Sequence, residues 1–339
     1  MYLSHLNHST AESGKLGFLV LNENKGFYYF EYNNDDDDIR RINIILTPPF
    51  KSSHYIVVGY FNGLDCLYGY QDYAYYICNR VTREYVMLPS IKRDFGDQHF
   101  YHSSGFGYLP LTNEYKVVEL YILSESKFIE VVVYTLGSGN GRRNVGRLEF
   151  MCLCYADPVY VNGAVHWLDY VKGGVLVFVL TEEKFRQHLS PPPMPYGGMP
   201  YSFNKTIGEL GRVLYYGINL VRVHFDIWLL KEKNDNLDME DQVEHEPLGW
   251  RKEFSLPGRK PLTFTKSGGV LFSDDKSLAV YDATSSTSKK LLELTLYLGI
   301  FPHKNTLVSL KELGEEEIQI MKSDEIEEQK ALISRQSSK

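Results

Sequence analysis

Short runs in which apolar and polar residues alternate recur along almost the whole chain, separated by Gly, Asn, Asp and Pro. The clearest run, 161–168, contains the turn residues Asn162-Gly163, after which Val165 and Trp167 share one face and His166 lies on the other. Asn-Gly tolerates the positive φ of a tight hairpin turn, and the side chains of a strand alternate between its two faces. The pattern therefore predicts a hairpin turn followed by a half-buried strand, with His166 on the more exposed face.

The same combination of turn and strand returns at four other places, which are Asn62-Gly63-Leu64, 105–108, 211–216 and 268–272. Intervals of roughly 40 to 50 residues between such turns, with about four strands in each interval, are typical of a β-propeller, and the longer intervals of this chain need only extended surface loops. The chain contains six strand-rich segments and almost no helical periodicity. We therefore expect an all-β, propeller-like fold of about six blades, built from short antiparallel strands.

A last apolar segment, 306–310, follows the sixth strand-rich segment. Pairing a C-terminal strand with the first blade closes the ring and removes an exposed sheet edge. We expect 306–310 to be this closing strand. The polar remainder, 314–339, is expected to be a frayed helix or a disordered tail.

Composition narrows the class of protein without changing the expected fold. The 339 residues are 43% hydrophobic, enough for a large core, and the 26 tyrosines are expected on strand faces with their hydroxyl groups at a wet edge. The 36 basic and 43 acidic side chains give a net charge of −7, which argues against nucleic acid as a partner. Four cysteines are few for this length, and neither a secretory signal nor an apolar run of about 18 residues is visible. We expect a soluble protein without a membrane partner, cytoplasmic and/or nuclear.

Four groups of residues have spacings that ligand binding or catalysis uses in other proteins. The loop 137–143 carries glycines and two arginines that suit a phosphate, but it precedes no expected helix and lacks the P-loop lysine. The pairs His99/His102 and Cys152/Cys154 have no second pair at the spacing of a structural zinc site, and His166 belongs to no recognisable catalytic motif. We expect a hairpin loop at 137–143, a His166 that is hydrogen-bonded to a neighbouring strand or loop, no metal or cofactor, and no enzymatic activity.

A series of short motifs follows a fixed order along residues 17–313. The series is Asn62-Gly63-Leu64, Cys78-Asn79-Arg80-Val81-Thr82-Arg83-Glu84-Tyr85, Leu88-Pro89, Gly105-Phe106-Gly107-Tyr108, 113–118, 159–168, 182–185 with Pro191-Pro192, Asp226-Ile227-Trp228 and 307–310. It resembles the F-box-associated domain, of type 1 or type 3, of plant F-box proteins. The resemblance implies structural roles for Asn62, Gly63, Gly105, Gly107, Asn162, Gly163, His166, Trp167 and Trp228. Arg80 stands where that family usually has a proline, which leaves Asn79 to cap the turn.

The resemblance implies a protein-interaction module that recognises the substrate of an SCF-type ubiquitin ligase. In that family the propeller, here 15–313, holds the target protein, while an F-box ahead of it binds a Skp-family adaptor. Residues 1–14 resemble the segment that follows an F-box, so this chain looks truncated. We expect a Skp-family adaptor as a partner only if an F-box lies upstream. The identity of the target protein is unknown.

Partner binding on a propeller is expected at loops that carry aromatic anchors. Three stretches of this chain meet that description, and their candidate contact residues are Tyr70, Tyr73, Phe95, Phe100, Tyr101, Met194, Tyr196, Met199 and Tyr201. For 194–201, a loop that packs over the ring is the other interpretation. Two alternatives for the whole chain stay open, a propeller that binds a small molecule or a glycan through tyrosines and a remnant without function.

Overall fold

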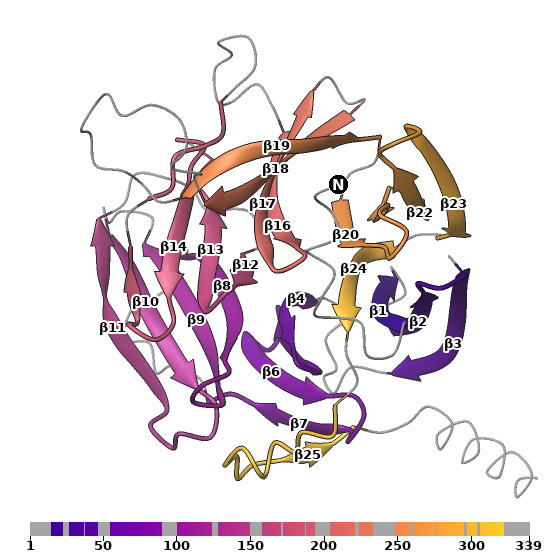
Figure 1. The fold of residues 1–339 in the computed structure, drawn as a ribbon. Coiled ribbons are helices and arrows are strands. Elements are labelled where there is room, and N and C mark those ends of the chain that lie inside the picture. The colour runs from indigo at the N-terminus through magenta and orange to yellow at the C-terminus, as the bar shows by residue number, and fades with distance from the viewer. Residues whose placement is uncertain are drawn as a thin grey trace, which may run out of the picture.

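The computed structural model describes residues 15–22, 27–36, 38–46, 55–89, 100–123, 128–149, 158–170, 172–186, 188–193, 204–220, 224–232, 248–257, 260–274, 276–294, 297–303 and 306–321. Within these residues the chain is all-β, and its strands form six antiparallel sheets arranged around a ring (Figure 1). Five sheets have four strands and one has five. The protein is a six-bladed β-propeller, as the spacing of the turns predicts.

The sheets are numbered here as blades in chain order, and the strands of each blade are given from the axis of the ring outward. The bounds are β24 (Tyr297–His303), β1 (Lys15–Asn22), β2 (Phe27–Asn33) and β3 (Asp38–Leu46) in blade 1; β4 (Tyr55–Phe61), β5 (Leu64–Gly69), β6 (Ala74–Asn79), β7 (Glu84–Met87) and β25 (Gln319–Ile320) in blade 2; and β8 (Phe100–Leu109), β9 (Glu114–Leu123), β10 (Phe128–Thr135) and β11 (Arg142–Glu149) in blade 3.

The remaining three blades follow the same order. Their strands are β12 (Val159–Val161), β13 (Ala164–Leu168), β14 (Val175–Val179) and β15 (Lys184–Phe185) in blade 4; β16 (Asn204–Leu210), β17 (Val213–Leu220), β18 (His224–Glu232) and β19 (Leu248–Leu256) in blade 5; and β20 (Lys260–Phe264), β21 (Val270–Ser273), β22 (Ser277–Asp282) and β23 (Thr287–Glu293) in blade 6.

A C-terminal strand closes the ring, but it is a different strand from the one that the sequence predicts. β24 pairs with β1 and supplies the innermost strand of blade 1, with Gly17 opposite His303 and Leu19 opposite Phe301. Residues 306–310 form no strand, because side chains of blade 2 form hydrogen bonds with their backbone groups. Asn79 Nδ2 donates to the carbonyl oxygens of Thr306 and Val308, and the Leu310 amide donates to Glu84 Oε2.

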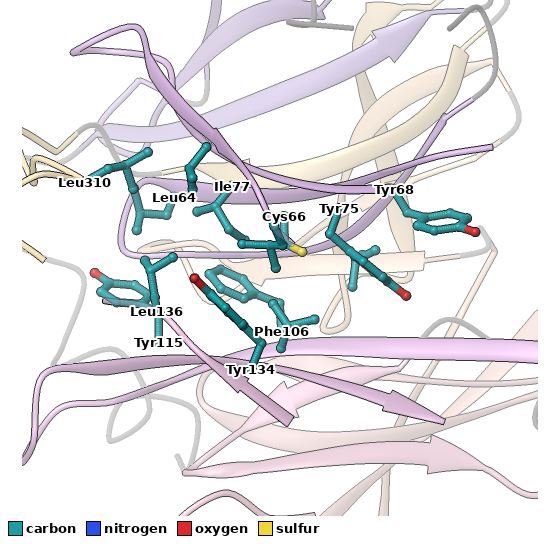
Figure 2. Close-up of a cluster of buried hydrophobic side chains, with 14 residues drawn as sticks. Leu64, Cys66, Tyr68, Tyr75, Ile77, Phe106, Tyr115, Tyr134, Leu136 and Leu310 are labelled. Atoms are coloured by element: carbon teal, nitrogen blue, oxygen red, sulfur yellow. The ribbon is translucent and has the colours of Figure 1, made fainter. Parts of the chain in front are cut away.

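Residues 306–321, here called the strap, run along the outer edge of blade 2. Figure 2 shows Leu310 beside Leu64 and Ile77, within the apolar cluster that joins blades 2 and 3. Burying a leucine stabilises a fold by about 2 kcal/mol. The Glu315 carboxylate accepts hydrogen bonds from Tyr134 Oη (2.9 Å) and from the Gly137 amide (2.7 Å), so the strap is also tied to blade 3.

The strap overlaps the segment for which the sequence predicts a tail. Its end forms β25, which pairs with β7, and Met321 is buried among residues of blades 1 and 2. Residues 314–321 are therefore packed as part of the propeller, whereas the sequence predicts a frayed helix or disorder there. The rest of the predicted tail, 322–339, lies outside the described residues, as does the predicted segment 1–14.

The tight turns have the geometry that their sequences predict. Asn62 and Gly63 have φ values of 46° and 78°, and Asn162 and Gly163 have 47° and 81°. Both pairs connect the innermost strand of a blade to its second strand. Two successive residues with positive φ define the hairpin turn whose twist matches the flanking strands.

The strand Ala164–Leu168 is buried on both faces, so the expectation of a more exposed face at His166 is wrong. Val165 and Trp167 pack against blade 3, while Leu168 packs against Ile207 and Tyr216 of blade 5. Neighbouring blades cover both faces of a propeller sheet, and the same arrangement buries several tyrosines completely. Tyr32, Tyr75, Tyr115, Tyr215 and Tyr216 lie in the interior, against the prediction that tyrosine hydroxyls meet water.

Candidate functional site

The order of the strands divides the ring into two faces. In blades 2 to 6 the chain supplies the four inner strands in succession, and they run antiparallel, so the chain leaves the fourth strand at the face where the inner strand of the next blade begins. We call this the connection face, and it also carries the β5–β6 and β13–β14 turns. The opposite face, here the hairpin face, carries Asn62-Gly63 and Asn162-Gly163. β1 begins and β24 ends at the hairpin face, so both ends of the described ring leave from there.

The β5–β6 turn presents two exposed aromatic rings on the connection face. Tyr70 is 49% exposed and Tyr73 is 67% exposed. Tyr73 has a φ of 49°, a left-handed conformation that is strained for an aromatic residue. Asp72 accepts a hydrogen bond from Tyr76 Oη (2.9 Å), and the Tyr68 ring lies 5.4 Å from that of Tyr70, so both ends of the turn are held by neighbouring side chains.

The other predicted contact residues are only partly described. Phe100 and Tyr101 open β8, which begins at the connection face, and nothing more is described of their side chains. Phe95, Met194, Tyr196, Met199 and Tyr201 lie outside the described residues. They belong to the connections 88–99 and 186–203, and both connections join strand ends at the connection face. The strand ends that flank the three predicted stretches thus lie at one face of the ring.

A polar cluster that the sequence did not predict lies at the seam between blades 4 and 5 on the connection face. The Asp169 side chain is fully buried directly after β13, where its Oδ1 accepts a hydrogen bond from the Lys172 amide (2.9 Å). Its Oδ2 lies 3.2 Å from Nε2 of His188, a residue that follows β15. Tyr216 Oη donates to the Gly173 carbonyl (2.6 Å), which ties the β13–β14 turn to blade 5. The cluster therefore joins three separate stretches of the chain.

Lys205, the second residue of β16, completes this cluster. It is only 6% exposed and lies on the same side of β16 as Ile207, which packs into the seam. Burial lowers the pKa of Lys205, and the negative charge of Asp169 opposes this change only in part. Residues 169, 188 and 205 follow no known motif, so only the fold reveals that they meet.

His166 is a buried strand residue, as the sequence interpretation preferred over a catalytic role. Its Nδ1 lies 3.3 Å from the Val159 carbonyl oxygen of the adjacent strand β12. Burial lowers the pKa of His166 from its usual value of 6.5 to about 4, and contacts with the Val159 and Ala164 backbone oppose this only weakly. At neutral pH the ring is uncharged and enclosed, which suits a structural role.

The glycine, asparagine and tryptophan residues of the motif series hold the blades together. A Cβ atom on Gly105 would lie 2.4 Å from Val165 Cγ1, and one on Gly107 would lie 2.4 Å from the Tyr160 ring, so blades 3 and 4 meet only because both positions are glycine. Trp167 Nε1 donates to Ser103 Oγ (3.0 Å) across the same seam. Trp228 packs at the seam between blades 4 and 5.

Asn79 and Arg80 fix the β6–β7 turn in two different ways. Asn79 Oδ1 accepts hydrogen bonds from the Val81 (2.8 Å) and Thr82 (3.2 Å) amides, as expected for a turn-capping asparagine. The Arg80 guanidinium is buried in contact with the Asp65 carboxylate, and His303 Nδ1 lies 3.7 Å from the other oxygen of Asp65. Burial by itself would raise the pKa of Asp65, but the charge of Arg80 and the His303 ring outweigh it and hold that pKa below its usual value.

The loop 137–143 is a hairpin loop between β10 and β11, as predicted, and its arginines face carboxylates. Arg143 forms a bidentate pair with Glu183 (2.8 and 3.0 Å), and Arg142 Nε lies 3.3 Å from Glu119 Oε1. Within the described residues there is no group of three or more His, Cys, Asp or Glu that suits a metal ion. His99, Cys152 and Cys154 lie outside those residues. No helix in the described part of the chain is long and apolar enough to cross a membrane.

The structure defines the class of protein, which is a six-bladed propeller with an aromatic turn and a buried charged cluster on one face. Residues 16–238 match the family model described as the F-box associated beta propeller domain. The chain belongs to this family, which confirms the resemblance inferred from the motif series. The matched stretch runs from β1 past the end of β18, and therefore includes both the aromatic turn and the buried cluster.

Two curated relatives come from Arabidopsis thaliana. The chain is 23% identical over 241 residues to the F-box/kelch-repeat protein At3g23880, covering 68% of this chain and 62% of that protein. It is 25% identical over 239 residues to the F-box protein At3g07870, covering 61% and 54%. The chain thus spans less than two thirds of the length of either relative. Among solved structures, a chain of the nidogen/laminin complex aligns with a TM-score of 0.43 and 11% identity, over 86% of this chain and 99% of that one.

Proposed function

We propose that this propeller recruits a target protein through its connection face, as the substrate-recognition part of an SCF-type ubiquitin ligase. The observation that carries the proposal is the division of the ring, in which all three predicted contact stretches join strand ends at one face. Membership of the F-box associated family supports an interaction role in general. The names of the two Arabidopsis relatives, both F-box proteins, support the link to the ligase.

The aromatic turn supports a binding role for the connection face. Exposed tyrosines supply a large contact area at a low cost in side-chain entropy, and aromatic residues dominate the binding energy of many interfaces. Strained backbone conformations such as that of Tyr73 cluster at functional sites. The left-handed conformation at position 73 favours Gly or Asn, yet the residue there is an aromatic one. A tyrosine at this position is consistent with a role in contacting a partner.

The hairpin face suits attachment to the rest of a ligase. Any segment ahead of β1 joins the ring at the hairpin face, opposite the aromatic turn. An F-box in that position would bind a Skp-family adaptor on one side while the target occupies the other, so the two partners would not compete for space. We propose adaptor binding only for a polypeptide in which an F-box precedes β1, and we place its action in the cytoplasm or nucleus.

Affinity capture from plant extract with matched variants tests the proposal. The double variant Tyr70→Ser/Tyr73→Asn removes both rings, and asparagine tolerates the left-handed conformation at position 73. Leu111→Ser is the control, because Leu111 is 99% exposed in the β8–β9 turn on the hairpin face. We expect proteins that the unmodified chain retains to be lost, by about tenfold or more, with the double variant and to be kept by Leu111→Ser. Equal recovery with all three chains would rule out the aromatic turn as a contact.

A further inference from the structure

Lys205 differs from the other buried cations in the described part of the chain. Arg80 is in contact with Asp65, the Lys116 ammonium lies 2.9 Å from Glu183, and Arg142 lies 3.3 Å from Glu119. For Lys205, which is equally buried, no hydrogen bond or ion pair is formed with the described residues. Burying a charge is unfavourable unless a counter-charge or hydrogen bonds compensate it. The site is therefore incomplete as it stands within the described structure.

The β13–β14 turn passes close to the Lys205 ammonium on the connection face. Gly173 has a φ of 76°, and a Cβ atom at this position would lie 3.3 Å from Lys205 Nζ and 3.8 Å from the Pro191 ring. The left-handed conformation favours glycine, so the β13–β14 turn passes the ammonium without a side chain. Leu168 and Ile207 belong to the apolar cluster of the blade 4–5 seam.

The neighbouring carboxylate is engaged elsewhere. Asp169 directs Oδ1 to the Lys172 amide and Oδ2 towards His188, and it makes no ion pair with Lys205. The His188 side chain is 29% exposed, so its ring lies between the buried carboxylate and the surface. The negative charge of Asp169 acts on Lys205, although no ion pair forms between the two side chains.

We propose that Lys205 binds an anionic oxygen group of the partner, a carboxylate or a phosphate, at the seam between blades 4 and 5 on the connection face. This inference rests on the proposed function and specifies the chemistry of the target. An anionic oxygen supplies the direct hydrogen bond that no described residue gives the ammonium, and hydrogen bonds between ionised groups are stronger than neutral ones.

Peptide arrays with a single variable position test the proposal and separate the two sources of the anion. Peptides of otherwise randomised sequence carry Ser, Glu or phosphoserine at the centre, and the purified chain is compared with Lys205→Gln and Lys205→Arg. We expect the unmodified chain to prefer Glu or phosphoserine over Ser. Lys205→Gln should abolish that preference, with a loss of roughly tenfold, and Lys205→Arg should keep it. The preferred central residue identifies the source as carboxylate or phosphate.

A second measurement keeps the test independent of peptide sequence. Inorganic phosphate at constant ionic strength should raise the unfolding temperature of the unmodified chain more than that of Lys205→Gln, because a ligand that binds only the folded form stabilises it. Equal retention on all three arrays together with equal phosphate shifts would overturn the proposal. Capture that fails for Tyr70→Ser/Tyr73→Asn but not for Lys205→Gln would reject the anion site and keep the receptor function. A Lys205-dependent preference for Glu or phosphoserine peptides, without any captured target, would keep the anion site and reject the receptor function.

Discussion

Two clusters in this propeller contain the same three kinds of group, a carboxylate, a histidine and a cation, each drawn from a different stretch of the chain. In the first, Asp65, Arg80 and His303 close the seam between blades 1 and 2 at the hairpin face, and all three side chains are between 2% and 4% exposed. In the second, Asp169, His188 and Lys205 lie between blades 4 and 5 at the connection face. The first cation touches its carboxylate and the second does not.

The difference separates a cluster that holds the ring from one that is suited to a ligand. His303 is the last residue of the closing strand, so the first cluster joins β24 to blade 2 where the ring is completed. A paired, enclosed cation is costly to disturb, because removing it leaves a carboxylate buried without a partner. Lys205 has no such pair among the described residues, so we expect it to contribute little to folding. Three measurements of stability test this difference between the two clusters.

The largest effect is expected from Arg80→Ala. It leaves the Asp65 carboxylate buried beside a cavity, and we expect the free energy of unfolding in urea to fall by about 3–5 kcal/mol. The double variant Asp65→Leu/Arg80→Met removes both charges and should recover most of that loss. A loss below about 1 kcal/mol for Arg80→Ala would show that the pair does not hold the seam.

A smaller effect, dependent on pH, is expected from His166. Its ring is buried and contacts backbone groups, whereas the histidines of the two clusters lie near a carboxylate. Its pKa is about 4 in the folded chain and 6.5 in the unfolded chain, so the unfolded chain binds more protons between these values. The free energy of unfolding should therefore fall as the pH drops from 6.5 to 4, with a contribution of about 3 kcal/mol from this residue. Urea unfolding of the unmodified chain and of His166→Gln at several pH values isolates that contribution. Parallel pH profiles of the two chains would contradict the assignment.

The smallest effect is expected from Lys205→Met. This change removes a buried ammonium that has no contact partner among the described residues, and the methionine side chain fits an apolar seam. The free energy of unfolding should stay within about 1 kcal/mol of the unmodified value or increase. If Lys205→Met were as destabilising as Arg80→Ala, the two clusters would both be structural and the contrast between them would vanish.

The elements that the sequence predicts well are those set by neighbouring residues. Asn162-Gly163 specifies its turn through the φ values that these two residues tolerate, and the alternation around Trp167 specifies a strand. The exposure of His166 was mispredicted because it depends on the next blade, whose Ile207 and Tyr216 cover the far face of the strand. The motifs at Gly63, Gly163, Gly211 and Gly268 are turns of blades 2, 4, 5 and 6, whereas the motif at 105–108, expected as a further turn, lies inside β8.

The features that the sequence does not reveal are made by residues far apart in the chain. The apolar pattern of 306–310 alone predicts a strand. Asn79 and Glu84, which lie more than 200 residues earlier in the chain, instead form hydrogen bonds with the backbone of this segment. Lys205 meets Asp169 only because β16 follows blade 4 around the ring. The spacing of residues along the sequence does not reveal that these residues lie close together in the fold. The aromatic turn was predictable because Tyr70 and Tyr73 lie within one short connection.

The position of β24 has a consequence for how the chain is made. The inner edge of β1 is among the first parts of the ring to leave the ribosome, but its partner is residues 297–303, and the strap that covers blade 2 comes later still. Until residues 297–303 have been made, blade 1 exposes an unpaired strand edge, and such edges promote aggregation. The ring can therefore close only after residues 297–303 have been made, and a chain stopped before residue 297 lacks the inner strand of blade 1.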